Sequence, residues 1–349
     1  MLFHSQAYLV FLLAVLVAYW ALPWHRARVY LLVGASFAFY AFWSEWLALL
    51  VTGTTVMDYL LARAMDASRR HRVRQVLLCT SLTVNLGLLC YFKYVNFFLD
   101  ALRESLALVG GSASFPYLSV VVPFGISFYT FEAISYAVDV YRRKIPAEKS
   151  LPNFLLFILF FPHLVAGPIV RAPDFLPQVR REKRFSWLRV QVGVEFLLLG
   201  LFKKLVIADA MAIYSDPIIS PDSDPAKLRT SAAWLGVVAF TVRVYCDFSG
   251  YSDMALGSAL LLGYRLTPNF LTPFLSLNIG EFWRRWHVSL GTWLRDYVFI
   301  PLGGSRGSKL FVARNLLITF FLCGLWHGAA WSWVLWGTLN GALLVGHSW

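Results

Sequence analysis

Two histidines stand where an ionisable side chain is costly. His327 lies in Gly324-Leu325-Trp326-His327-Gly328, in the middle of a long apolar stretch. His287 lies in residues 282–290, an aromatic segment that also carries arginine. An ionisable residue inside a membrane segment is interpreted as functional by default. A neutral imidazole can act as general base on a hydroxyl group, so the two histidines predict a catalytic centre within the membrane.

The segment from Glu281 to Tyr297 predicts one amphipathic helix lying in the plane of the membrane surface. Its apolar face carries Trp283, Trp286, His287, Leu290, Trp293, Leu294 and Tyr297, and its opposite face carries Arg284, Arg285, Ser289, Thr292, Arg295 and Asp296. Guanidinium groups hold phosphates through paired hydrogen bonds. Arg284 and Arg285, with Trp283 and Trp286, are therefore candidates for binding an acyl donor. The alternative interpretation, that these arginines contact lipid headgroups, has about the same weight as donor binding.

Small residues predict tight packing around His327. Gly324 and Gly328 have a GxxxG spacing, and Gly337 and Gly341 repeat it. Such spacing lets helices approach closely, and Trp326 would then support the pocket. The alternative, with roughly one third of the weight, is a packing histidine that donates to a neighbouring carbonyl.

Two carboxylates, Asp247 and Asp253, lie in the otherwise apolar segment 245–253. One of them could orient an imidazole or pair with Arg243 or Arg265. Structural pairing is the favoured role, and ion coordination is a weaker alternative.

The composition predicts an all-α polytopic integral membrane protein. Of 349 residues, 58% are hydrophobic and 14% are charged, whereas a soluble domain is nearer a quarter charged. The net charge of +12 then belongs first to cytoplasmic loops, and no nucleic-acid partner is implied. The four cysteines show no CxxC spacing, so no metal site is predicted. P-loop, HExxH and dinucleotide motifs are absent from the sequence.

Apolar runs near the length of a bilayer span recur along a single predicted domain, residues 1–349. The expected helical segments are 8–22 (a retained first span), 29–42, 46–61, 76–98, 120–140, 190–214, 232–263 (a span plus a second helix), 310–326 and 330–345. Residues 154–170, broken by prolines and a glycine, predict a re-entrant segment.

Clusters of basic residues place one side of these spans in the cytoplasm. The poorly basic loops 100–115 and 216–224 are then expected outside. This topology puts His287 on the cytoplasmic side and His327 towards the other end of its helix, so the two imidazoles would approach one site from opposite faces.

The sequence resembles the membrane-bound O-acyltransferase (MBOAT) family, in particular its alginate O-acetyltransferase-like bacterial branch. The similarity covers nearly the whole chain and is strongest in residues 122–131, 164–171, 245–253, 281–304 and 324–331. The resemblance implies a bundle with re-entrant and interfacial helices around a central tunnel. It also implies that His327 matches the catalytic histidine and His287 a second polar position on the cytoplasmic side of that tunnel.

The same resemblance implies acyl transfer from a thioester donor, acetyl-CoA or an acylated carrier, with no permanently bound cofactor. The acyl group would cross the bacterial cytoplasmic (inner) membrane and reach an exported polysaccharide, usually with a periplasmic acetyltransferase partner.

Two features depart from the branch. Members usually carry a histidine in a WGxxHG pattern, where this chain has Asn340, which forms hydrogen bonds but cannot titrate. The branch also usually continues with further spans, so we expect that this chain is either a shortened protein or lacks the last helices of the branch. Two other functions stay open: D-alanyl transfer from a carrier protein to teichoic acid, and transport of a small anion or a lipid-linked sugar.

Overall fold

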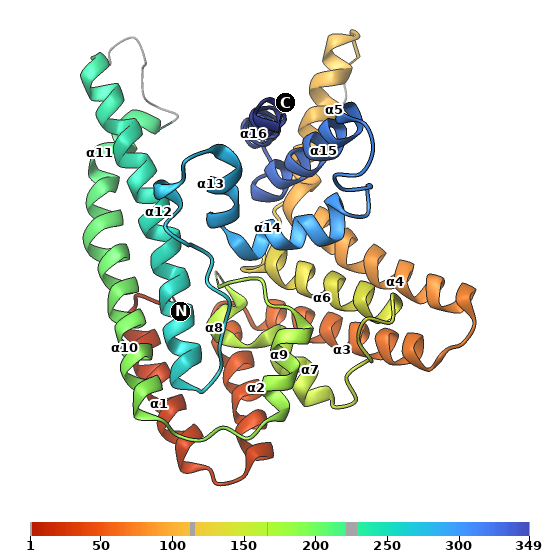
Figure 1. Cartoon of the computed structure of the whole chain (residues 1–349), viewed down its shortest axis with the longest axis vertical. Helices are drawn as coiled ribbons and strands as arrows, with labels where there is room; N and C mark the ends of the chain where they lie inside the picture. Colours follow the sequence, from red (N-terminus) through yellow and green to blue (C-terminus); the bar gives the residue numbers. More distant parts are fainter. Residues whose placement is uncertain (1, 112–115, 166, 221–228, 349) are drawn as a thin grey trace. The chain divides into compact units, whose positions relative to one another are not determined.

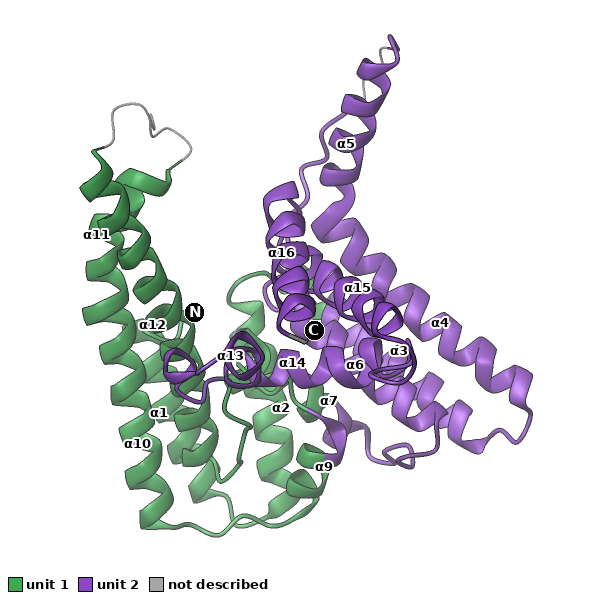
Figure 2. Ribbon diagram, turned by 45° about the horizontal axis from the view of Figure 1, so that its top comes forward, with its two compact units in different colours: residues 1–49, 155–170, 174–269 green, residues 50–154, 171–173, 270–349 purple. Residues whose placement is uncertain are grey.

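The computed structural model describes residues 2–111, 116–165, 167–220 and 229–348, and every regular element in this part of the chain is helical. The helices form two compact units (Figure 2). Unit 1 contains residues 1–49, 155–170 and 174–269, and unit 2 contains residues 50–154, 171–173 and 270–349. Each unit is assembled from three separate stretches, so the units are interleaved along the chain rather than successive.

Unit 1 is built mainly from helices of the first and middle parts of the sequence. They are α1 (Gln6–Ala21), α2 (His25–Ala41), α8 (Phe161–Leu164), α9 (Ala172–Arg180), α10 (Trp187–Leu201), the π-helical η2 (Phe202–Ala208), α11 (Asp209–Ile219) and α12 (Thr230–Leu261).

The long helix α12 runs unbroken from Thr230 to Leu261, which corrects the prediction of a span followed by a second helix (Figure 1). Glycines explain why the helix continues alongside α10 instead of ending. A Cβ added at Gly200 would lie 2.5 Å from the Gly250 carbonyl oxygen, and one added at Gly257 would lie 2.5 Å from the Gly193 carbonyl oxygen. Backbone-to-backbone contact of this kind is typical of helix pairs in membranes.

Unit 2 carries both histidines of interest. Its helices are most of α3 (Glu45–Ala67), α4 (His71–Leu89), the π-helical η1 (Cys90–Tyr94), α5 (Val95–Leu108), α6 (Ile126–Tyr141), the 3₁₀ turn η4 (Pro273–Leu275), α13 (Ile279–Arg285), α14 (Val288–Leu294), the π-helical η5 (Arg295–Phe299), α15 (Lys309–His327) and α16 (Trp331–Ser348). The helix α7 (Leu151–Leu159) contributes residues to both units.

One buried arginine ties two helix ends of unit 2 together. The Arg74 guanidinium donates to the Met65 carbonyl at 2.6 Å, near the end of α3. It also donates to the Val140 carbonyl at 3.0 Å and the Tyr141 carbonyl at 2.6 Å, at the end of α6. The last carbonyls of a helix have no partner within the helix, and a cation there also complements the helix dipole. Arg74 therefore satisfies the ends of α3 and α6 with one charge.

Four helices of the described residues are long and apolar enough to cross a membrane: Glu45–Ala67, His71–Leu108, Thr230–Leu261 and Lys309–His327. The first, second and fourth confirm the helices predicted over 46–61, 76–98 and 310–326. Helices also lie in the other predicted segments, with α1 and residues 151–164 as shorter apolar helices. The 120–140 helix begins later than predicted, at Ile126, after Gly125 in the left-handed conformation.

The segment predicted to be re-entrant is broken, as expected, into α7 and the short α8, with Pro162 in the first turn of α8. Its side chains from Phe154 to Leu164 are buried within the protein, except that of Leu155, which is half-buried. Broken backbone at membrane depth requires such cover, because lipid offers no hydrogen-bond partner. Ala166 of this segment, residues 112–115 of the 100–115 loop and residues 221–224 of the 216–224 loop lie outside the described residues.

Candidate functional site

The two histidines meet at the ends of helices in unit 2. His287 is the junction between α13 and α14, and His327 is the last residue of α15. Their ring centroids lie 6.3 Å apart. His287 is 2% exposed and His327 is half-buried. The prediction that both imidazoles approach one site agrees with this geometry.

The helix predicted over 281–297 is broken, which corrects the sequence-based expectation. Trp286 is extended (φ −97°, ψ 128°), and His287 is left-handed (φ 44°, ψ 55°). A left-handed residue other than glycine is uncommon and persists where the surrounding structure holds it. The hydrophobic period continues through the break, so the pattern of residue types does not reveal it.

The break also changes which side chains share a face. A cavity of about 550 Å³ lies beside both imidazoles within unit 2. It is lined by Gly280, Trp283, Arg284, Trp286, His287, Val288, Leu290, Gly291, Thr292, Leu294, Arg295, Phe299, Leu316, Thr319, Phe320, Cys323, His327, Leu344 and His347. The predicted separation of apolar and basic faces is therefore wrong, because Arg284 and Arg295 line the same cavity as Trp283 and His287.

Of the four predicted donor-binding residues, three line the cavity: Trp283, Arg284 and Trp286. Arg285 does not line it, and its guanidinium instead pairs with Glu281 at 2.5 Å. His347, near the end of α16, also lies on the cavity wall. The sequence gives no signal for this position, since α13 and α16 come together only in the fold.

Aromatic rings pack around His327. The Trp326 ring lies 5.1 Å from the His327 ring and 5.9 Å from the His287 ring. Trp333 stacks on His327 at 5.4 Å, and Trp336 meets it edge-on at 5.2 Å. The imidazole is therefore oriented by packing on more than one side.

Close contact of α15 and α16 positions this aromatic group. A Cβ at Gly324 would collide with the Trp333 carbonyl oxygen, and one at Gly337 would lie 2.8 Å from the Gly324 Cα. The predicted glycine contact is confirmed for Gly324 and Gly337. It brings Trp333 and Trp336 onto His327.

Lys93 is a functional candidate that the sequence analysis missed. It lies in the π-helical turn η1, a feature that often marks functional positions. Its ammonium donates to the Trp326 carbonyl and, at 3.1 Å, to the Ser127 hydroxyl. The neighbouring Tyr94 hydroxyl donates to the Leu325 carbonyl at 2.8 Å. Two consecutive carbonyls directly before His327 are thus held by two consecutive residues of η1.

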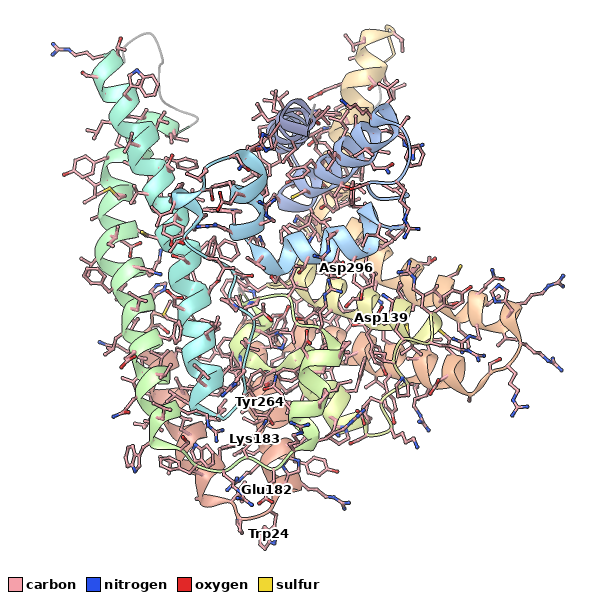
Figure 3. All side chains as sticks on the ribbon, viewed as in Figure 1. Trp24, Asp139, Glu182, Lys183, Tyr264 and Asp296 are labelled. Carbon is pink, nitrogen blue, oxygen red and sulfur yellow. The ribbon has the colours of Figure 1, made fainter. Side chains whose placement is uncertain are left out.

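A second group of contacts positions α14. The Trp293 ring stacks on Phe131 of α6 at 3.7 Å, and its indole N–H donates to the Phe131 carbonyl at 2.8 Å. The Tyr297 hydroxyl donates to Asp139 at 2.7 Å. Arg171 lies over the Tyr297 ring at 4.6 Å and pairs with Asp296 at 3.4 Å (Figure 3). These contacts anchor the helix that follows His287 to α6.

The predicted supporting carboxylates belong to unit 1. Asp247 pairs with Lys204 at 2.7 Å, and Asp253 pairs with Lys203 at 2.6 Å. Structural pairing was the favoured expectation, but the partners are lysines of η2 rather than Arg243 or Arg265. The π-helical geometry of η2 has no signature in the sequence, so these partners could not be chosen from spacing.

Asn340 takes no part in the group around His327. Its amide donates to the Trp336 carbonyl of its own helix at 2.8 Å. This bond ties the side chain to α16 on the turn that carries Trp336.

The model of the membrane-bound O-acyltransferase family matches residues 141–348, which include both histidines. The chain belongs to the membrane-bound O-acyltransferase family. As an MBOAT it is a polytopic membrane protein, in agreement with its helical structure and its four long apolar helices.

Individual MBOAT relatives extend the similarity to the N-terminal part. The chain is 42% identical to a probable alginate O-acetylase of Pseudomonas aeruginosa, over 99% of this chain and 65% of that protein. It is 36% identical to a peptidoglycan O-acetyltransferase of Helicobacter pylori, over 90% of this chain and 63% of the relative. A teichoic acid D-alanyltransferase of Bacillus subtilis is 28% identical over 63% of this chain and 58% of its own length. The chain thus spans about two thirds of the length of the first two relatives.

Proposed function

We propose that this protein is an O-acyltransferase that moves an acetyl group from a cytoplasmic thioester donor to a hydroxyl of an exported polysaccharide. The observation that carries the proposal is the pair of imidazoles, 6.3 Å apart, on one cavity of about 550 Å³. The names of two relatives, a probable alginate O-acetylase and a peptidoglycan O-acetyltransferase, support O-acetyl transfer to a polysaccharide.

His327 serves as general base in this mechanism. Its imidazole takes the proton of the acceptor hydroxyl while the hydroxyl oxygen attacks the thioester carbonyl carbon. The C–S bond then breaks, and the imidazolium returns the proton to the leaving thiolate. The products are an ester and a free thiol, so atoms and protons balance. Rings packed on more than one side of His327 hold the base in place and exclude water.

His287 lines the same cavity as the base, with the two ring centroids 6.3 Å apart. We assign to it the donor side, where its imidazole holds the thioester for attack. Arg284 lines the same cavity and would hold phosphates of acetyl-CoA or of the prosthetic group of an acylated carrier. Arg285, paired with Glu281, is less suited to this role than Arg284.

The acceptor is either the sugar hydroxyl itself or a hydroxyl on a periplasmic acetyltransferase that relays the acyl group. Both lie outside the bacterial cytoplasmic membrane in this proposal, so the acyl group crosses the membrane through the protein. D-alanyl transfer to teichoic acid is the second candidate, supported by the Bacillus subtilis relative. The lower identity and the shorter overlap of that relative favour O-acetyl transfer.

The test compares the O-acetyl content of exported polysaccharide in cells carrying wild type, His327→Ala or His287→Ala at matched membrane levels. His71→Ala is the control, because His71 lies at the start of α4 and does not line the cavity. We expect the acetyl content to fall to background with His327→Ala and to remain unchanged with His71→Ala. Normal acetylation with His327→Ala would overturn the proposal.

A further inference from the structure

Several cations at one end of unit 1 lack a carboxylate partner. They lie at the start of α2, in the segment before α10 and in the first turn of α10, and are Arg28, Arg181, Lys183, Arg184 and Arg189. Among the described residues none of the five forms an ion pair, including with Glu182, which is exposed next to Lys183. A group of like charges without counterions is costly unless solvent or a bound anion compensates it.

Lys183 is the central member of this group, because it is charged and yet buried, at 8% exposure. Its ammonium lies 4.3 Å from the centre of the Tyr264 ring (Figure 3). No described oxygen accepts a hydrogen bond from it. Burial, with the charges of Arg189 and Arg181, lowers the pKa of Lys183 to about 8. The ammonium therefore lies in surroundings that favour an added negative charge.

Gly263 brings a second cation to the same place. It is left-handed (φ 84°), and a Cβ added there would lie 3.2 Å from Arg189 Nη1 and 3.4 Å from the Lys183 side chain. The Lys183 stem and the Arg189 guanidinium thus converge on one residue without a side chain.

The segment that carries Lys183 is held in place by Arg28. The Arg28 guanidinium donates to the Lys183 carbonyl at 2.8 Å and to the Leu22 carbonyl at 2.8 Å. It also lies 5.3 Å from the Tyr19 ring and 5.1 Å from the Trp20 ring. Arg28 is therefore committed to the protein. The Arg189 guanidinium donates from Nη2 to the Arg184 carbonyl at 3.0 Å, and none of its other N–H groups has an acceptor among the described residues, so Lys183 and Arg189 are the cations for a ligand.

Aromatic side chains around these cations indicate where this end of the unit lies. Trp24 is 69% exposed and Trp187 is 73% exposed, and Phe185 is also exposed. Figure 3 shows Trp24, Glu182, Lys183 and Tyr264 at the same end of unit 1. Exposed tryptophans in a membrane protein gather at the level of the lipid headgroups. The unpaired cations are thus at the depth where lipid phosphates lie.

We propose that Lys183 and Arg189 bind the phosphodiester of an anionic membrane phospholipid, with Gly263 and Tyr264 forming the floor of the site. Basic pockets between helices on the cytoplasmic side of membrane proteins bind such headgroups. The ammonium supplies a point charge, and the guanidinium supplies paired donors to phosphate oxygens. This site is independent of the proposed acyl transfer.

The test measures the binding of phosphatidylglycerol to the delipidated protein in neutral detergent by native mass spectrometry. Phosphatidylcholine and inorganic phosphate are the comparison ligands. The variants are Lys183→Met, which keeps the apolar stem over Tyr264, and the double variant Lys183→Met with Arg189→Gln. Arg69→Gln, an exposed arginine of unit 2, controls for loss of charge in general.

We expect wild type to bind phosphatidylglycerol selectively. Affinity should fall about fivefold with Lys183→Met and roughly thirtyfold with the double variant, at about one kcal/mol for each charge. Lys183→Arg should retain binding, which separates a lost charge from a misfolded segment. Equal binding of phosphatidylcholine, unchanged binding by the folded double variant, or displacement of the lipid by inorganic phosphate at equal concentration would each overturn the proposal.

Discussion

At the scale of single residues, Lys93 brings a positive charge to the backbone directly before His327, because its ammonium donates to the Trp326 carbonyl. Among the described residues Lys93 pairs with no carboxylate. A half-buried lysine without a counterion is costly in a membrane span and is interpreted as functional by default. We assign it the positioning of His327 through the last turn of α15.

Lys93→Met should reduce acyl transfer by roughly a hundredfold without raising KM, because a base displaced by about 1 Å costs that much. Lys93→Arg should recover part of kcat, since a guanidinium still donates to the Trp326 carbonyl. The measurement is steady-state transfer to an acceptor by membranes of matched protein content. Lys149→Met, at an exposed lysine, is the control. A wild-type kcat for Lys93→Met would refute the assignment.

Because the backbone of His287 is left-handed, substitutions at this position can distinguish its chemical role from its structural role. Asparagine adopts this conformation readily, whereas a β-branched residue is strained there. His287→Asn should therefore keep the thermal midpoint of wild type in detergent and lose acyl transfer, while His287→Val should lose both. Equal midpoints for the two variants would show that the break between α13 and α14 does not depend on residue 287.

At the scale of helices, the contact between α15 and α16 determines the position of His327 relative to its tryptophans. Gly337→Ala would press a methyl group against the Phe320 carbonyl and the Gly324 backbone. Overpacking of this kind costs about 1–3 kcal/mol. Gly346→Ala, on the same helix, meets nothing within 4 Å and is the matched control.

Differential scanning calorimetry of the two purified variants tests this contact. Gly337→Ala should melt at a lower temperature than wild type. Gly346→Ala should melt at the same temperature or slightly higher, since alanine is favoured over glycine inside a helix by about 0.5–1 kcal/mol. A normal midpoint for Gly337→Ala would mean that α15 and α16 separate without cost.

The sequence predicted the helical class and the two histidines, because long apolar runs and ionisable residues within them are local signals. It did not predict the break at His287, since the spacing of apolar residues is the same on both sides of it. Lys93 was missed for a different reason. Its partner, the Trp326 carbonyl, is 233 residues away and is a backbone atom, which has no residue type to recognise.

At the scale of the whole molecule, Lys183 links stability to pH. Burial beside Arg189 and Arg181 lowers the pKa of Lys183 from 10.5 to about 8. The folded protein therefore binds fewer protons at this residue than the unfolded chain between about pH 8 and 10.5, and stability should rise with pH across that window. The other groups that face or flank Lys183 are Arg28, Tyr264, Glu182 and Arg184.

The measurement is the thermal midpoint of delipidated protein between pH 7.5 and 10.5. Lys183→Met should show a smaller rise than wild type. Added phosphatidylglycerol should also reduce the rise for wild type, because a bound anion stabilises the charged ammonium. Identical slopes for wild type and Lys183→Met would show that Lys183 does not titrate in this range.

The bonds of Arg74 have a consequence for how the chain is made. Arg74 emerges from the ribosome 66 residues before Val140, one of the carbonyls that it binds. At 5–20 residues per second, about 3 to 13 s of synthesis separate the two. α4 is completed during that interval, but of the three carbonyls that the guanidinium binds only that of Met65 has been made. The helical hairpin formed by α3 and α4 thus acquires its bonds to the Val140 and Tyr141 carbonyls only after the end of α6 is translated. The rate of translation therefore limits how soon this part of unit 2 can assemble.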